Sequence, residues 1–187
     1  MDIQLKEIYR LARPFLVVQD ASKEYGLPAA KLLAMLTEER RNNHTDIIRV
    51  IRGHKSHTKY EFANEVSAAY QFPFDFTGRS WDALDEFMND LDWLPPTDKY
   101  LLIILNADQL LLDEPLKDFE ILMNILKGTS NNWEQGINHD ILVRAYQEEV
   151  VPKTSRFAVV LQQSPDAPLD NNYGSWLKAA NPSILTI

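Results

Sequence analysis

Three short and strongly apolar runs constrain the fold of this 187-residue chain more than any other feature. Residues 46–51 read DIIRVI and end near Gly53, residues 100–105 read YLLIIL, and residues 157–161 read FAVVL. Such runs are typical of strands that are buried on both faces of a sheet. Segments with helical spacing separate them, and parallel strands need such crossovers. We therefore predict an α/β fold with a small three-stranded parallel sheet covered by helices.

The rest of the chain adds an extension at each end of this unit. We predict an extra N-terminal helical segment at residues 1–45, although the apolar run at residues 15–18 is also compatible with a strand. Residues 46–163 form the α/β domain, with an insertion at about residues 137–155. Residues 164–187 are rich in Pro and Asn, and we expect them to pack on the surface as a tail.

A helix with only negative charges on its polar face is the feature that points to function. Apolar residues recur at helical spacing over residues 81–93, which predicts an amphipathic helix. Its polar side carries carboxylates with no basic residue between them: Asp82, Asp85, Glu86, Asp90 and Asp92. Carboxylates four residues apart repel each other by roughly 0.3 kcal/mol per pair. We therefore predict that this face is kept as a negatively charged binding surface.

The composition limits the classes of partner. With 19 basic and 27 acidic residues, the chain has a formal charge of −8, which repels nucleic acid and anionic membranes and attracts basic proteins. It has no cysteine, which excludes disulfides, thiol catalysis and cysteine-based zinc sites. The N-terminus lacks the apolar core of a signal peptide, and no run reaches the roughly 18–20 apolar residues of a membrane span. We therefore expect a soluble, cytoplasmic protein.

These elements, in this order, resemble the barstar family of ribonuclease inhibitors. The resemblance begins at IIRVIRG (residues 47–53) and continues through AAYQFP (residues 68–73). Its most specific part is FDFTGRSWDALDEFM (residues 74–88), where the family has an aromatic loop, a glycine and a helix with a hydrophobic-Asp-Ala-Leu core. In all, the resemblance covers roughly residues 46–136 and 156–163.

The resemblance implies a protein that is not an enzyme, binds no cofactor and inhibits a nuclease, in the simplest case an RNase toxin. Members of the family press the acidic helix and the preceding loop into the basic active site of an RNase, where carboxylates replace the phosphates of RNA. By position, Asp82 and Glu86 match the acidic residues of the first two turns, and Phe76 matches a contacting loop aromatic. Asp85 departs from the family pattern, which can carry Trp at this position, and this difference suggests a different partner.

The resulting prediction is a partner-binding surface without catalytic or metal-ligating residues. It consists of Phe76, Arg79, Asp82, Asp85, Glu86 and Asp90. Several of these have structural alternatives: Asp82 complements the helix dipole after a Ser80 cap, and Arg79 fits a solvated loop charge. We expect Trp81 and Trp93 to anchor the helix in the core, and the four histidines to be solvated loop residues.

Two other functions remain open from the sequence. The first is a non-inhibitory scaffold or oligomer on the same fold, with residues 1–45 as its interaction element. The second is an enzyme that uses paired carboxylates as acid and base or around Mg²⁺. If residues 1–45 covered the acidic helix, the scaffold hypothesis would gain support. The solvent accessibility of Asp82, Glu86 and Asp90 therefore distinguishes the scaffold hypothesis from the inhibitor hypothesis.

Overall fold

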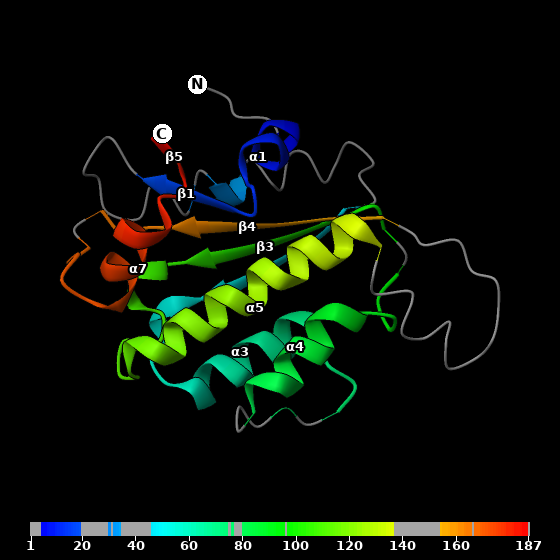
Figure 1. The fold of residues 1–187 in the computed structure, drawn as a ribbon, viewed down its shortest axis with the longest axis horizontal. Coiled ribbons are helices and arrows are strands. Elements are labelled where there is room, and N and C mark those ends of the chain that lie inside the picture. Colours follow the sequence, from blue (N-terminus) through cyan, green and yellow to red (C-terminus); the bar gives the residue numbers. More distant parts are fainter. Residues whose placement is uncertain are drawn as a thin grey trace.

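The elements of this computed structural model alternate between strands and helices along the chain (Figure 1). The structure describes residues 5–19, 30, 32–34, 46–74, 76, 80–95, 97–136, 154–165 and 167–186. The strands are β1 (Phe15–Gln19), β2 (Ile47–Arg52), β3 (Lys99–Leu105), β4 (Arg156–Gln162) and β5 (Ser183–Thr186). The helices are α1 (Leu5–Leu11), α3 (Lys59–Tyr70), α4 (Trp81–Asp90), α5 (Leu116–Gln135) and α7 (Asn172–Ala180), with single 3-10 turns η1 (Gly53–Lys55) and η2 (Ala107–Gln109).

The sheet is parallel, as predicted, but it has five strands in the order β2-β3-β4-β1-β5. The prediction of three strands is therefore wrong in number. The three apolar runs form β2, β3 and β4, which are neighbours, and the run at residues 15–18 becomes β1 between β4 and β5. β5 was not predicted because it is a four-residue edge strand with three exposed residues, and such a strand needs no continuous apolar run.

Both faces of the sheet are buried, which explains the unbroken apolar pattern of its central strands. Along β3, Leu102 and Ile104 face one core, whereas Leu101 and Ile103 face the other. Helices α3, α4, α5 and α7 cover the first face, as Figure 1 shows for the three long helices below the sheet. The alternation of strand side chains between two apolar layers is the physical reason for this three-layer fold.

The N-terminal residues cover the opposite face. Ile8, Tyr9 and Ala12 of the α1 segment are buried with the second core, together with Leu32. In the second part of the predicted N-terminal segment, residues 20–45, only residues 30 and 32–34 are described, and they are helical. The N-terminal region thus supplies a strand and a covering helix to the same sheet, so it is not simply a helical segment added to a finished domain.

The C-terminal region is also built into the fold. Tyr173 and Trp176 of α7 are buried in the core below the sheet, and β5 pairs with β1. Of the insertion predicted at about residues 137–155, residues 137–153 lie outside the described part of the chain. Among the described helices, none combines the length and the apolarity that a membrane crossing requires.

Candidate partner-binding surface

Helix α4 begins at Ser80 because the side chain of this residue caps it. The Ser80 hydroxyl accepts hydrogen bonds from the backbone N–H groups of Asp82 at 3.2 Å and Ala83 at 3.5 Å. Asp82 lies in the first turn, where a negative charge complements the helix dipole. Leu84 and Met88 are fully buried against the core. The cap and this apolar side together fix which face of α4 points to solvent.

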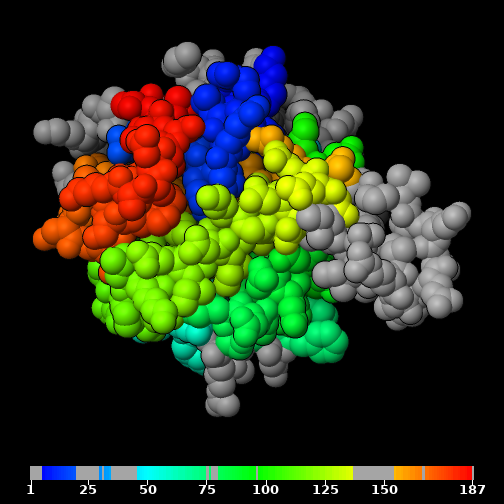
Figure 2. Space-filling model, viewed as in Figure 1, coloured from blue at the N-terminus to red at the C-terminus, as the bar shows by residue number. Residues whose placement is uncertain are grey.

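The polar face of α4 is open to solvent. Every carboxylate of the predicted acidic face is exposed: Asp82, Asp85, Glu86, Asp90 and Asp92. Figure 2 shows α4 (green) at the surface beside α5 (yellow-green). Of the described N-terminal residues, Ile8, Tyr9, Ala12 and Leu32 pack in the core on the other face of the sheet, and β1 lies within the sheet, so they do not cover this helix. The structure therefore brings the four predicted carboxylates of the site together on one accessible helix.

Hydrogen bonds from both ends of α5 hold α4 in place. The Trp81 indole donates to Asp118 Oδ1 at 2.7 Å, and the Trp133 indole donates to the Met88 carbonyl at 3.0 Å. Asn132 also donates to Asn89 Oδ1 at 3.2 Å. Partly buried Trp81 thus anchors the helix, in agreement with its predicted role. These contacts present the acidic face on a fixed support.

Asp85 is the one carboxylate of this face with a described side-chain partner. The Asn89 side-chain amide donates to the Asp85 carbonyl at 2.8 Å and to Asp85 Oδ1 at 3.0 Å. Because Asn89 also bonds Asn132, the Asp85 side chain is oriented by a chain of contacts that reaches α5. Asp85 departs from the family pattern, and the structure gives it a restrained conformation on the α5 side of the acidic face.

An aromatic cluster fixes the loop before α4. Phe72 stacks on Phe87 of α4 with ring centroids 4.6 Å apart, and Phe76 meets the edge of Phe87 at 6.2 Å. Trp93 completes the cluster and donates its indole N–H to the Tyr70 carbonyl at 2.9 Å. Phe72 and Phe76 of the loop therefore pack on α4 at Phe87, and Trp93 has the anchoring role predicted for it.

Within this loop the exposed aromatic is Phe74, whereas the prediction selected Phe76. Phe76 is only 7% exposed and belongs to the core, whereas Phe74 is 73% exposed. The segment FPFDF alternates, so Phe72 and Phe76 point inward and Phe74 points outward. That alternation was visible in the sequence, but it does not say which set faces in. Arg79, the other predicted loop residue, lies outside the described residues.

Asp90 differs electrostatically from its neighbours. Its partial burial raises the pKa of the carboxyl group above its usual value, and the charge of Asp92 raises it further. Asp90 is also the last residue of α4, where the negative end of the helix dipole disfavours a carboxylate. The fold therefore does not stabilise a negative charge at this position.

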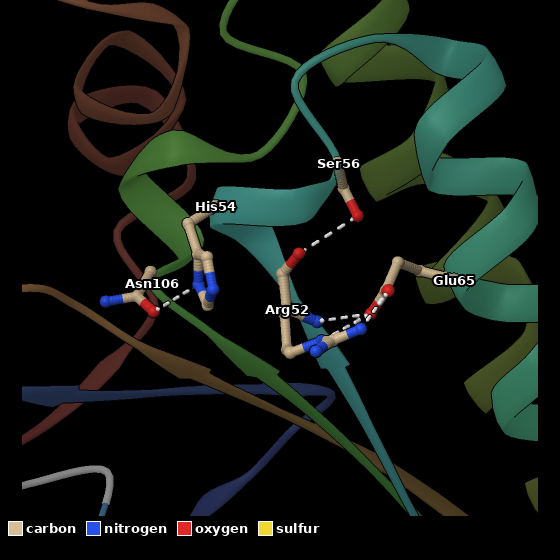
Figure 3. Close-up of polar contacts among 5 residues, drawn as sticks. All are labelled: Arg52, His54, Ser56, Glu65 and Asn106. Carbon is tan, nitrogen blue, oxygen red and sulfur yellow. Dashed lines mark hydrogen bonds and ion pairs between the residues drawn. The ribbon is translucent and has the colours of Figure 1, made fainter.

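A second group of polar side chains lies where β2 and β3 end (Figure 3). Arg52 donates to the two carboxylate oxygens of Glu65 at 2.6 and 3.1 Å, and this pairing lowers the pKa of Glu65. His54 Nδ1 lies 3.0 Å from Asn106 Oδ1, so His54 is bonded and not merely solvated. In the described part of the chain, no three His, Asp or Glu side chains are grouped as metal ligands. The His54–Asn106 contact ties the ends of β2 and β3 together, and the Arg52–Glu65 pair ties the end of β2 to α3.

Comparisons with known proteins place this geometry in a family. The family model described as Barstar (barnase inhibitor) matches residues 47–145, which include β2, α3, α4, β3 and α5. No curated protein matches the chain. The match to the family model covers more than half of the chain and contains the whole acidic helix.

Two solved structures resemble this chain over nearly all of its length. The ORC2 protein of Aeropyrum pernix in its ADP form matches with a TM-score of 0.53 and 11% identity over 93% of this chain. The same protein in ADPNP–ADP complexes matches with a TM-score of 0.55 and 10% identity over 97%. This chain covers 42% and 46% of those two chains, less than half of their length. At such identity the likeness concerns the fold alone, whereas the family match identifies the relationship: this chain belongs to the barstar family.

Proposed function

We propose that this chain is a barstar-like inhibitor or immunity protein that occludes the basic active site of a nuclease, in the simplest case an RNase toxin. The observation that carries the proposal is the exposed row of Asp82, Glu86 and Asp90 on a capped and anchored helix. Two of these carboxylates, Asp82 and Glu86, stand where the family resemblance expects contact residues. The partner-binding surface of the proposal contains this row, Asp85 and the loop aromatic Phe74.

Charge mimicry is the proposed mechanism. Residues four apart on one helical face are about 6 Å apart along the helix axis, so the row offers regularly spaced negative charges as a nucleic acid strand does. A nuclease cleft lined with Lys and Arg attracts such a row and accelerates the encounter. The excess of acidic over basic residues in the whole chain acts in the same direction. Binding is therefore expected to weaken as salt concentration rises.

The two alternative functions lack comparable support. The scaffold hypothesis would gain support if residues 1–45 covered α4, but in their described part α1 packs on the other face of the sheet and β1 lies within the sheet. An enzyme with paired carboxylates needs a second wall of functional groups, and the acidic face is an exposed convex helix. The ORC2 likeness adds no nucleotide site, since the chain has no GxxxxGK[ST] motif.

The experiment is a pull-down from the native source followed by a nuclease inhibition assay. Wild-type chain should capture a basic nuclease at low salt, release it at high salt and inhibit it stoichiometrically. The double variant Asp82→Lys/Glu86→Lys should lose capture and inhibition but still unfold cooperatively, with a Tm lower by no more than about 2–4 °C because the charge in the first turn of α4 is reversed. Truncating one partner of a buried charge pair typically costs about 2–5 kcal/mol of binding free energy, and reversal should cost at least as much.

The matched control is Glu120→Lys/Asp170→Lys, which changes the net charge by the same amount at exposed positions away from α4. This control should retain capture, because the acidic face is intact. Equal loss of binding in both double variants would point to net charge alone. Full inhibition by Asp82→Lys/Glu86→Lys would reject the acidic face as the inhibitory surface.

A further inference from the structure

A cleft of about 470 Å³ opens on the face of the sheet covered by α5 and α7. It exists because β1 begins later than its neighbour β4, and β5 begins later than its neighbour β1. Phe15, the first residue of β1, pairs with Val159, whereas β4 already begins at Arg156, and Ser183 of β5 pairs with Leu16. Figure 2 shows where the blue β1 segment, the red α7 and β5 segment and the yellow-green α5 meet. The sheet edge is thus stepped back, and a hollow remains between the two helices.

The floor of the cleft is apolar and its rim carries two cations. Phe15, Met123 and Trp176 line it and are buried, with the rings of Phe15 and Trp176 edge to face at 5.2 Å. Arg13 and Lys127 also line the cleft. Within the described residues neither of them has a carboxylate within ion-pair distance; Arg13 bonds only the Arg10 carbonyl, at 3.4 Å. In the described part of the chain, two cations that lack a carboxylate partner thus lie beside an indole and a phenyl ring, and together they form an amphiphilic site.

The charges are placed unevenly along the cleft. Glu120 is the carboxylate of the α5 wall and lies two helical turns before Lys127. Because α5 runs back from the carboxyl end of β3 to the amino end of β4, Lys127 lies on the side of the cleft where Arg13 precedes β1. The cleft therefore has a positive end at the amino edge of the sheet, with the aromatic floor beside it.

We propose that this cleft binds a small anion with a flat apolar body, such as an aryl carboxylate or aryl phosphate. A planar guanidinium pairs with either anion through two hydrogen bonds, and an ammonium adds a second charge. The volume of the cleft falls in the range of about 300–1,000 Å³ that is typical of small-molecule sites. Residues 13–15 and 176–183 lie outside the segment matched by the family model, whereas the α5 wall lies inside it, so the cleft forms between the family core and what this chain adds to it.

The test is a titration of the full chain with benzoate, phenyl phosphate and benzyl alcohol, followed by two-dimensional NMR of backbone amides and indole N–H groups. The two anions should shift signals of Phe15, Met123 and Trp176 and bind at least about fivefold more tightly than the neutral alcohol. The stronger of the two anions identifies carboxylate or phosphate as the preferred head group. Lys127→Glu should weaken anion binding about five- to tenfold, and Arg13→Gln should weaken it in the same direction.

Lys178→Glu is the matched control, because Lys178 is exposed on α7 but does not line the cleft. It should change anion affinity less than about twofold. Equal weakening by Lys127→Glu and Lys178→Glu would overturn the proposal, since net charge would then explain the binding. Equal affinity for benzyl alcohol and the anions, shifts centred on other residues, or no shifts at about 20 mM anion would each overturn it as well.

Discussion

At the scale of single residues, Asp90 shows a conflict between stability and the proposed function. Its carboxyl group has a raised pKa in the folded chain, so the fold favours the protonated form. A raised pKa means that folding loses stability as pH rises through the native pKa of the group. Retaining a charged residue there is consistent with selection for binding, because proteins commonly keep destabilising groups at functional surfaces.

We therefore expect Asp90→Asn to stabilise the chain at pH 7 and to weaken binding of the proposed nuclease partner. The side chain is largely exposed, so the gain in free energy of unfolding should stay below about 0.5 kcal/mol, or roughly 1–2 °C in Tm. The gain should shrink as pH falls through the native pKa of Asp90 and vanish below its unfolded value, where wild type is also neutral. Asp82→Asn, in the first turn of α4, should lower stability instead. Thermal denaturation from pH 3 to pH 7 measures the change in Tm of both variants. If the Tm of Asp90→Asn and that of Asp82→Asn shift in the same direction at pH 7, this account is contradicted.

The loop aromatics give the second prediction at this scale. Phe76→Ala removes a buried ring from the cluster with Phe72 and Phe87, and should cost about 3–5 kcal/mol of unfolding free energy. Phe74→Ala removes an exposed ring and should change stability by less than about 0.5 kcal/mol. Exposed aromatic side chains are typical interface hot spots, so Phe74→Ala should weaken binding of the proposed nuclease partner by at least tenfold.

Urea unfolding and binding titration of the same two variants separate the roles. If Phe74→Ala binds like wild type, the loop aromatic is not part of the interface and the acidic row acts without it. If Phe76→Ala unfolds like wild type, the inward orientation of the FPFDF alternation is wrong.

At the scale of elements, the sequence identified the acidic helix and the central strands because their apolar pattern reflects burial, but it did not predict α7 in the region expected to be a surface tail. β2, β3 and β4 were found because both of their faces are covered, and α4 was found because one face is buried and the other is charged. β5 was missed because an exposed edge strand has no such pattern. The direction of Phe74 was missed because alternation fixes which residues share a side, whereas tertiary packing decides which side is inside.

At Gly128 of helix α5, intrinsic helix propensity and tertiary packing can be compared. Glycine in a helix interior is less favourable than alanine by about 1 kcal/mol. A Cβ atom added at Gly128 would have no neighbour within 4 Å, so the packing does not require glycine there. Gly128→Ala should therefore raise the free energy of unfolding by about 0.5–1 kcal/mol.

Gly53 provides the contrasting control, because a Cβ atom there would lie 2.1 Å from the Asn106 carbonyl oxygen. Gly53→Ala should destabilise the chain by about 1–3 kcal/mol, since η1 and η2 would have to move apart. Urea denaturation of the two variants should give changes of opposite sign. Destabilisation by Gly128→Ala would mean that α5 is packed more tightly at this turn than the structure shows.

At the scale of the whole molecule, the family core and the added strands form one sheet. The family match ends before β4, and it omits β1, α7 and β5, yet β1 lies between β4 and β5. β1 bonds along β4 from Phe15 to Val18, and its residues Leu16 and Val18 fill the second core beside Leu101 and Ile103. A resemblance confined to the family core could not predict this, because it carried no information on residues outside the match.

The arrangement predicts that residues 1–19 cannot be removed without loss of the fold. Their deletion would expose the edge of β4 and uncover the apolar face formed by Leu101, Ile103 and Val160. Because an open apolar edge strand promotes aggregation, the truncated chain should be insoluble or lack cooperative unfolding. Size-exclusion chromatography and thermal denaturation measure this. A peptide of residues 1–19 added during refolding should restore soluble protein that unfolds cooperatively, because β1 is held by packing and strand hydrogen bonds. If the truncated chain is instead monomeric and unfolds cooperatively without the peptide, the family core is stable alone.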